Sequence, residues 1–597
     1  MFNPEYIEKF KLANPKVYQL FRDAKNPRNA RSAVRSYIEK MISKLDKNTE
    51  RIVPLEWTLQ VSCLLTLKKI FSIRSERLTR YSIILVLYNI AKEKYDQLPD
   101  ELNDGFFEEI IHLFLGIRGK SGIYENEPYP EFTHHTGRDA AISRSAQLDQ
   151  MAEHCFKYIK RYKSGLDEDI INKRKVNKER ISNYFQANSD DWGNYLWQIR
   201  HVIRDVDQLQ ELIDLTDNEK RAIQLARENH LPFGITPYYV SLMDKEPDRV
   251  HDHAVRAQVI PPLDYVEYMI SNRDDRTQCF DFMMEQDTSP IDLITRRYPM
   301  ICILKPYNTC SQICVYCQRN WEIQDVLATD ALATRDHISN ALEWIRQHPA
   351  ITEVLITGGD PLVMNNERIN WVLSQVAEIK HVERIRIGSR TPVVLPQRIT
   401  DELLEIISQY HVPGLREVVL VSHFEHPYEI TPEAMQAVQK FKKQGISVYN
   451  QAVYTIENSR RFEMVALRRL LRLIGVDPYY TFNTKGKEET KSYRVPLARL
   501  QQEIKEEARL LPGTVRTDEA VYNVPKLGKN YIRAQQHHSI LTILPEGKRV
   551  YEFHPWEKNL SMADTFIDTD VSIYDYLQTL EKRGEDINDY KSIWYYI

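Results

Sequence analysis

The chain has 597 residues, of which 42% are hydrophobic and 27% are charged, and its formal net charge at pH 7 is -4. This composition is typical of a globular protein with two or three domains. It gives no general attraction to polyanions, so we expect no nucleic-acid partner. No apolar run approaches the roughly 18 to 20 residues of a membrane span, and the polar first residues do not resemble a secretory signal. We therefore expect a cytoplasmic protein with no membrane partner.

Residues 1–185 are predicted to be helical, because apolar positions recur at helical spacing, as they do within 33–42. This region contains no motif with a catalytic spacing. We predict a large helical N-terminal region and assign it no role.

The pattern changes at about residue 298, where apolar strands begin to alternate with amphipathic helices. The predicted strands are 300–304, 352–356, 384–387, 417–421, 447–452 and 477–482, and the predicted helices are 338–347, 367–378, 401–410, 432–443, 462–474 and 497–511. Six such units in series imply a parallel sheet with helices outside it. The predicted fold class is α/β, a partial (β/α)6 barrel, and sites on such a barrel lie at the carboxyl ends of its strands.

Directly after the first predicted strand, Cys310, Cys314 and Cys317 form a CxxxCxxC motif. Three thiolates on one short loop can hold three irons of a 4Fe-4S cluster and leave the fourth iron free for an external ligand. A structural zinc site is less favoured, because such sites use a second pair of Cys or His ligands and no cysteine follows Cys317. Free cysteines also occur as small buried apolar residues. The spacing favours the cluster, which suits a reducing compartment.

Chemically distinctive residues lie at or just after the ends of the next four predicted strands, in the order Gly358, Gly359 and Asp360, then Ser389 and Arg390, then His423, then Gln451. A double glycine lets the backbone approach a ligand closely, and the carboxylate after it can bind an ammonium group or a ribose hydroxyl. A hydroxyl beside a guanidinium suits phosphate or carboxylate. Each motif alone is more often structural than functional. Their placement on successive strand ends favours one shared site.

About three fifths of the chain, from about 190 to 552, resembles the lysine 2,3-aminomutase family of radical S-adenosylmethionine enzymes. The matching segments are 235–239, 287–290, 297–299, the cysteine loop and the long run 385–400. The resemblance implies that the open iron of the cluster binds S-adenosylmethionine and cleaves it to a 5'-deoxyadenosyl radical. It also implies that pyridoxal 5'-phosphate holds an amino acid while its amino group moves from C2 to C3.

The resemblance implies roles for particular residues. The cofactor-binding positions are Tyr298, Gly358, Gly359, Asp360, Ser389, Arg390, His423 and Gln451. Arg319, two residues after the last cysteine, matches the arginine that binds the substrate carboxylate, for which a bidentate guanidinium is well suited. Lys529 matches the lysine that carries pyridoxal phosphate, and Lys526 is its competitor.

Two departures from the family concern the substrate. Lysine-specific members hold the distal ammonium of the substrate with two aspartates, and this chain has Lys485 and Asn523 at those positions. A cation and an amide favour a side-chain carboxylate over an ammonium group. The same pair is known from glutamate 2,3-aminomutases, so we predict conversion of L-glutamate to β-glutamate. Another amino acid or a peptide is the alternative substrate, and Lys485 pointing to solvent is the alternative structural interpretation.

Other departures concern the cofactors. The glycine-rich lysine loop of the family is shortened here to Pro525-Lys526-Leu527-Gly528-Lys529, and Ile301 replaces a basic residue near the pyridoxal phosphate. A cluster-containing regulatory protein that has lost pyridoxal phosphate is therefore the alternative of another class. The zinc cysteines of the family are absent, so we expect no zinc.

The predicted domains are a helical region at 1–185, a helical family-type segment at 186–297 that wraps the barrel, the barrel at 298–515, and a C-terminal segment with the lysine loop at 516–597. The expected partners are a small amino-acid substrate and an electron donor such as flavodoxin or ferredoxin. A homo-oligomer is also considered.

Overall fold

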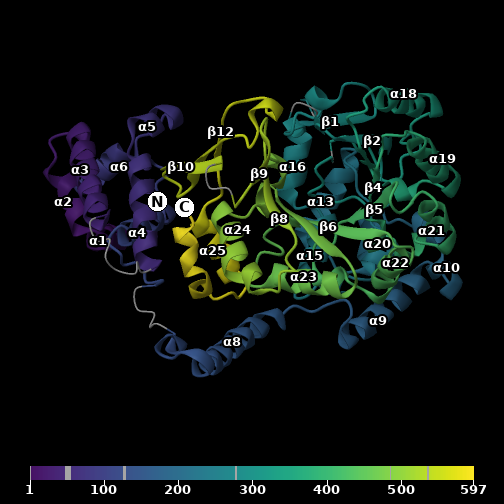
Figure 1. The fold of residues 1–597 in the computed structure, drawn as a ribbon, viewed down its shortest axis with the longest axis horizontal. Helices are drawn as coiled ribbons and strands as arrows, with labels where there is room; N and C mark the ends of the chain where they lie inside the picture. Colours follow the sequence, from purple (N-terminus) through teal and green to yellow (C-terminus); the bar gives the residue numbers. More distant parts are fainter. Residues whose placement is uncertain are drawn as a thin grey trace.

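The computed structural model describes residues 2–46, 55–124, 130–275, 279–319, 321–484, 486–533 and 537–597. Among the predicted site residues, Lys485 lies outside this part of the chain. Figure 1 shows helices of the N-terminal region at one end, the C-terminal segment in the middle and the α/β part at the other end.

The α/β part contains a nine-stranded sheet whose strands are ordered as they occur in the chain. The strands are β1 (Ile294–Tyr298), β2 (Ile301–Tyr307), β3 (Glu353–Gly358), β4 (Arg384–Gly388), β5 (Glu417–Ser422), β6 (Ser447–Tyr454), β7 (Asp477–Asn483), β8 (Glu519–Val524) and β9 (Gly528–Tyr531). Strands β2 to β8 are parallel, while β1 and β9 pair antiparallel at the edges. The six predicted strands are present as β2 to β7, and the sheet of the described residues is open.

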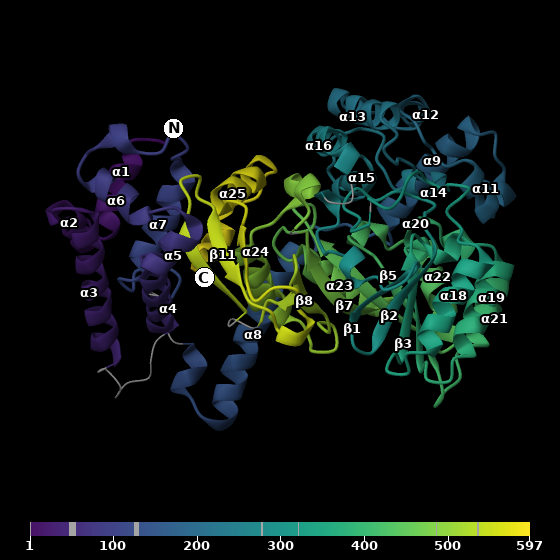
Figure 2. The ribbon, with the colours of Figure 1, turned by 90° about the horizontal axis from the view of Figure 1, so that it is seen from above.

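The strands alternate in burial, because one face of the sheet packs against helices. In β2, Cys302 and Leu304 are buried, whereas the residues between them are half-buried on the opposite face. The outer helices are α18 (Arg335–Arg346), α19 (Asn366–Ala377), α21 (Asp401–Ser408), α22 (Pro432–Lys443), α23 (Glu463–Leu473) and α24 (Leu497–Gln502), and Figure 2 shows several of them flanking the strands. Threonine or asparagine side chains cap the N-termini of the first four.

The predicted helix 497–511 is wrong in its second half. The α-helix ends at Gln502, and a wider π-helical turn (Glu503–Glu507) and a short 3-10 turn (Ala508–Leu510) follow it. Glu503 and Glu507 of this turn bind the buried arginines Arg468 and Arg499. These partners come from elsewhere in the fold, so helical periodicity does not reveal them.

The N-terminal region is helical, as predicted. Its helices are α1 (Glu5–Ala13), α2 (Pro15–Asp23), α3 (Pro27–Asp46), α4 (Leu55–Ile70), α5 (Ile73–Thr79), α6 (Ile83–Ala91), α7 (Asp104–Gly116), α8 (Gly137–Ile159) and α9 (Glu168–Tyr184). Helix α8 lies beside α23, where the rings of Tyr158 and Phe462 are 5.4 Å apart. No helix in the described ranges is both long and apolar enough to cross a membrane.

Helices α4 and α5 pack on a second, three-stranded sheet formed by β10 (His538–Ile543), β11 (Arg549–Phe553) and β12 (Phe566–Thr569). A buried ion pair joins Glu109 of α7 to Arg549 of β11, with Nε–Oε1 2.9 Å apart. Because breaking a buried pair leaves an uncompensated charge, this contact fixes the N-terminal helices to the C-terminal segment.

The segment between the N-terminal helices and the sheet contains α10 (Ser189–Gly193), α11 (Tyr195–Arg200), α12 (Val206–Leu212), α13 (Asp217–Glu228), α14 (Pro237–Val240), α15 (His253–Val259) and α16 (Leu263–Ser271). The nine-stranded sheet takes β1 from this segment and takes β8 and β9 from the C-terminal segment. It therefore extends past both ends of the predicted barrel range 298–515.

Candidate active site

The cysteine motif lies in the loop that follows β2, at the carboxyl end of the parallel sheet. All three thiols are partly buried. Backbone hydrogen bonds attach the loop to the preceding helical segment: the Ile313 amide donates to the Gly234 carbonyl (3.0 Å) and the Val315 amide to that of Gln258 (2.7 Å). Burial, opposed by nearby Arg390, raises the pKa of the Cys314 thiol to about 11. Without iron the thiol is thus protonated, and ligation to a metal has to displace its proton.

Gly359 allows the β3 loop to pack directly on the cysteine loop. A Cβ atom at this position would lie 2.0 Å from the Thr309 carbonyl oxygen and 2.4 Å from the Thr309 nitrogen. The Asp360 amide also donates to the Thr309 carbonyl (2.9 Å). Gly359 therefore allows the β3 loop to lie against Thr309, the residue before Cys310. A side chain at position 359 would prevent this contact.

Replacing Gly359 by alanine is expected to destabilise the cysteine loop, because backbone atoms cannot move aside as a flexible side chain can. Overpacking of this kind costs about 1 to 3 kcal/mol or more, and we expect a lower urea midpoint together with reduced iron content after anaerobic reconstitution. Gly513→Ala is the matched control, because its Cβ would meet no atom within 4 Å. Equal iron content in wild type and Gly359→Ala would contradict this prediction.

The Asp360 carboxylate joins the β3 and β4 loops. It accepts hydrogen bonds from the Ser389 hydroxyl (2.7 Å) and from the amides of Leu362, Arg390 and Thr391, at 3.1, 2.9 and 3.0 Å. These bonds occupy both carboxylate oxygens. Asp360 and Ser389 therefore organise the loops around the cysteines, and their predicted contact with a cofactor stays a prediction.

The Arg390 side chain lies behind the cysteine loop. Its Nη1 donates to Cys314 Sγ (2.6 Å), and its Nη2 donates to Glu429 Oε1 (2.7 Å) and to Gln258. A guanidinium beside a thiol favours the thiolate that a metal needs. The arginine thus supports Cys314 electrostatically, a contact that the sequence did not suggest.

His423, which directly follows β5, lies beside Gln451 within β6. His423 Nδ1 is 3.0 Å from the Gln451 carbonyl oxygen. Burial and the charge of Arg390 lower the pKa of His423 to about 4, so the ring is neutral at pH 7. A carbonyl accepts only, so Nδ1 carries the proton and Nε2 is left as an acceptor.

Arg319 belongs to a charged cluster on the inner face of the sheet. Its Nη2 lies 2.9 Å from Glu285 Oε1, and Lys305 Nζ lies 3.0 Å from the same oxygen and 3.1 Å from Glu322 Oε1. Burial acts against ionisation of Glu285, but Arg319 and Lys305 outweigh it and hold its pKa below the usual range. Sequence reasoning missed Lys305 and Glu285, although a lysine in the apolar strand β2 was a usable signal.

The two candidate lysines of the shortened loop differ in their surroundings. Lys526 is exposed in the turn between β8 and β9 and has a positive φ of 63°. Lys529 is half-buried on β9, with Nζ 4.0 Å from the ring centre of Tyr480 and 5.6 Å from that of Tyr298. Burial, together with Arg386 and Arg297, lowers the pKa of Lys529 to about 8. An amine that is partly neutral near pH 7 is what imine chemistry requires, so Lys529 fits this role better.

Asn523 is buried on β8 and is the cross-strand partner of Lys529. This pairing brings a predicted substrate residue and the candidate lysine to the same pair of strands. Lys485, which follows β7 in the chain, lies outside the described residues.

A family-model comparison finds no match for the chain. An uncharacterised KamA family protein of Methanocaldococcus jannaschii is 46% identical over 545 residues, which cover 88% of this chain and 87% of that protein. The chain belongs to the KamA family. This is a radical S-adenosylmethionine family. The predicted resemblance is thereby confirmed.

Other relatives of this KamA-family chain carry enzyme names. The glutamate 2,3-aminomutase of Clostridioides difficile is 35% identical over 59% of this chain and 79% of its own length. The L-lysine 2,3-aminomutase of Methanococcus maripaludis is 32% identical over 56% of this chain and 72% of its own length. Aminomutases are isomerases, so the chain belongs to a family of isomerases. The M. jannaschii match extends beyond the part shared with these aminomutases.

One further group of possible metal ligands occurs in the described part of this KamA-family chain, formed by His253, His426 and Glu463. Arg460 Nη2 lies 2.7 Å from Glu463 Oε1 and 3.0 Å from His253 Nε2. A guanidinium in this position already neutralises the carboxylate and repels a cation. The group is therefore a buried ion-pair network and not a metal centre.

Proposed function

We propose that the protein is a radical S-adenosylmethionine 2,3-aminomutase that uses pyridoxal phosphate, and that its open sheet acts as a partial barrel around the substrate. The observation that carries this proposal is the joint presence of two groups in one KamA-family chain. One is the cysteine motif at the carboxyl end of β2, and the other is Lys529, a partly neutral amine among aromatic rings.

The residues present fit the expected cofactors. Cys310, Cys314 and Cys317 supply three thiol ligands for a 4Fe-4S cluster, and the fourth iron would remain for S-adenosylmethionine. The backbone at Gly358 and Gly359, together with His423 Nε2 and Gln451, would hold S-adenosylmethionine. Lys529 would hold pyridoxal phosphate, with Tyr298 and Tyr480 beside it. When bound, these groups supply the radical and a conjugated ring that stabilises the rearranging amino acid.

The side chains of the protein bind and orient the substrate. Arg319 would donate hydrogen bonds to the substrate α-carboxylate, which has to replace Glu285 as its partner. Lys305 shares both carboxylates of this cluster, so it can retain Glu285 when Arg319 turns to the substrate. The aromatic rings around Lys529 exclude water from the reacting centre.

We propose L-glutamate as the substrate and β-glutamate as the product. Support comes from the charge of the predicted pocket, in which Lys485 and Asn523 stand where lysine-specific enzymes have two aspartates. The similarity to a glutamate 2,3-aminomutase agrees with this choice. Lysine, another amino acid or a peptide would be disfavoured if their distal groups are cationic.

The substrate assignment predicts that Lys485→Asp lowers kcat/KM for L-glutamate by at least about tenfold, because a like charge replaces an attractive one. The enzyme is reconstituted anaerobically with iron, sulfide, S-adenosylmethionine and pyridoxal phosphate, and each of the common amino acids is screened for its β-isomer. Asn523→Ala serves as a second variant, since it removes the amide without adding a charge. Equal glutamate turnover by wild type and Lys485→Asp would refute the charge argument.

Reductive cleavage needs one electron, which a flavodoxin or ferredoxin in the cytoplasm would supply. We propose that residues 298–515 with the lysine loop in 516–597 form the catalytic part, that 186–297 wraps it, and that 1–185 stabilises the C-terminal segment through contacts such as Glu109–Arg549. Light scattering, which measures molar mass in solution, would show whether the protein forms a homo-oligomer.

A further inference from the structure

A small cavity lined by four arginines lies on the outer side of the sheet, away from the cysteine loop. Arg468 comes from α23, Arg509 from the turn after the π-helical segment, Arg516 from the chain just before β8, and Arg533 from the chain after β9. Its volume is about 50 Å³, several times the roughly 10–15 Å³ that one water needs. It has room for a small oxyanion.

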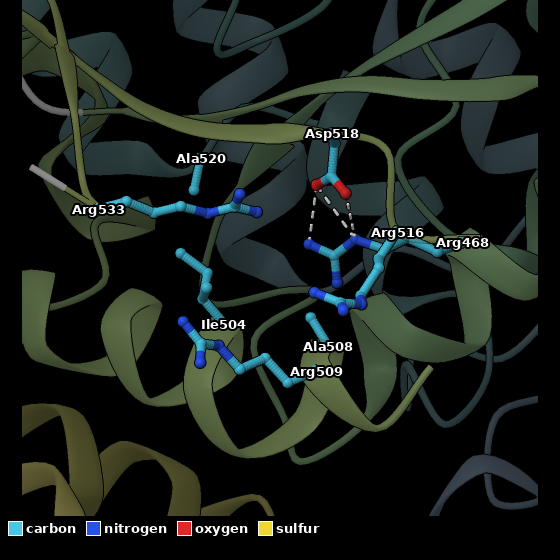
Figure 3. Close-up of a pocket in the computed structure, with 8 residues that line it drawn as sticks. All are labelled: Arg468, Ile504, Ala508, Arg509, Arg516, Asp518, Ala520 and Arg533. Atoms are coloured by element: carbon cyan, nitrogen blue, oxygen red, sulfur yellow. Dashed lines mark hydrogen bonds and ion pairs between the residues drawn. The ribbon is translucent and has the colours of Figure 1, made fainter. Parts of the chain in front are cut away.

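The four guanidinium groups are not equivalent. Arg468 is neutralised, because its Nε and Nη2 bind Asp518 at 2.9 Å each and its Nη1 binds Glu503 at 2.5 Å. Thr481 donates to Asp518 as well (2.6 Å). Asp518 is the only carboxylate among the described residues that line the cavity. Because it is paired with Arg468, it adds no unpaired negative charge to the cavity. Figure 3 shows this pair joined by dashed lines.

The other three arginines gather around the same opening (Figure 3). Within the described ranges, Arg509 and Arg516 form no ion pair, and Arg533 has only a long contact of 3.5 Å with exposed Glu519. Arg509 and Arg533 are exposed and Arg516 is half-buried. Like charges around one opening repel each other, and an anion between them reduces that repulsion. Planar guanidinium groups match phosphate geometry in particular, because each can donate two parallel hydrogen bonds.

A second, larger groove continues from this cavity and shares Ile504, Arg509 and Arg533 with it. Its volume is about 320 Å³, which is in the range of small-molecule sites. Leu59 of α4 and Ile532 are apolar residues in its lining, to which the C-terminal residues 595–597 also belong. Ile504 of the wider turn Glu503–Glu507 lines both spaces, and such turns occur often at functional sites.

We propose that this cavity binds the phosphoryl group of a small phosphorylated molecule whose organic part occupies the neighbouring groove. A carboxylate is a weaker candidate, because its single negative charge would compensate only part of the repulsion among three guanidinium groups. The site is separate from the proposed aminomutase centre, so ligand binding requires neither the cluster nor pyridoxal phosphate.

Titration calorimetry of the full chain at constant ionic strength tests this proposal with inorganic phosphate, phenyl phosphate and acetate, with chloride as the balancing anion. We expect saturable binding of both phosphates, tighter binding of phenyl phosphate because its ring buries apolar surface in the groove, and no saturable binding of acetate. Absence of phosphate binding, or equal binding of acetate, would overturn the assignment. If phenyl phosphate binds no more tightly than inorganic phosphate, the groove does not hold the organic part of the ligand, and that part of the proposal is refuted.

Variants locate the bound anion. Arg516→Gln and Arg509→Gln are each expected to weaken phosphate binding by at least about tenfold, the effect of losing a charge-assisted hydrogen bond. Arg221→Gln on α13 is the matched control, since Arg221 is exposed and has no ion pair with a described residue. Glu519→Gln releases Arg533 and is expected to keep or tighten binding, which a general loss of folding does not produce. Unchanged affinity in both arginine variants would refute the site.

Discussion

Replacing Cys317 by serine is expected to abolish cluster assembly and, with it, turnover of any substrate. A serine hydroxyl does not ionise near neutral pH, so only Cys310 and Cys314 would remain to hold three irons. Changes in residues that merely support metal ligands cost about 10- to 100-fold in activity, so loss of a ligand is expected to cost at least about a thousandfold. Iron and sulfide content and the visible absorbance of the reconstituted protein measure the first effect, and β-isomer formation measures the second.

Cys155→Ser is the control for this experiment. Cys155 is likewise a partly buried free cysteine, but it lies on α8, outside the motif. It should leave the iron content unchanged, because its environment contains apolar and aromatic side chains and no other cysteine of the described residues. If Cys317→Ser retains full iron content, the cluster assignment fails, whichever activity is measured.

Local patterns in the sequence were sufficient for the parallel strands β2 to β7 and for the cysteine loop, but they did not reveal the parallel strand β8. Alternation along β2 and β4 and continuous apolar runs in β3 and β5 are properties of the strands themselves, so they could be predicted. The position of Cys310 after a strand followed directly. The antiparallel edges β1 and β9 are less visible, because each is short and contains several charged or polar residues.

Contacts between distant segments could not be predicted in the same way. The sequence showed Asp360 and Ser389 as separate candidates, but only the fold shows that they bind each other. Glu109 and Arg549 are 440 residues apart and give no local signal. The arginine cavity could not be predicted for the same reason, since its four guanidinium groups come from different parts of the fold. Long-range electrostatic partners therefore account for most of what the sequence did not reveal.

Lys529→Ala is expected to remove covalent attachment of pyridoxal phosphate, whereas Lys526→Ala is expected to retain it. With a pKa of about 8, roughly a tenth of the Lys529 side chains are neutral at pH 7, compared with fewer than one in a thousand for an ordinary lysine. Only the neutral amine is a nucleophile. Borohydride reduction followed by peptide mass mapping identifies the modified lysine. Modification of Lys526, or of neither lysine, would refute the assignment.

The same lysine predicts how stability depends on pH in the cofactor-free protein. Burial lowers the folded-state pKa of Lys529 from 10.5 to about 8, so between these values the unfolded chain binds more protons than the folded one. Stability due to this group therefore rises as the pH increases from about 8 to 10.5, and at pH 7 the charged amine costs about 3 kcal/mol. Lys529→Met should raise the free energy of unfolding at pH 7 by up to about that amount, with the gain shrinking toward pH 10.5. Lys526→Met changes an exposed position and should show no such trend. Urea unfolding at several pH values measures both variants. If their stabilities depend on pH in the same way, Lys529 is not the buried amine on which the pyridoxal phosphate assignment depends.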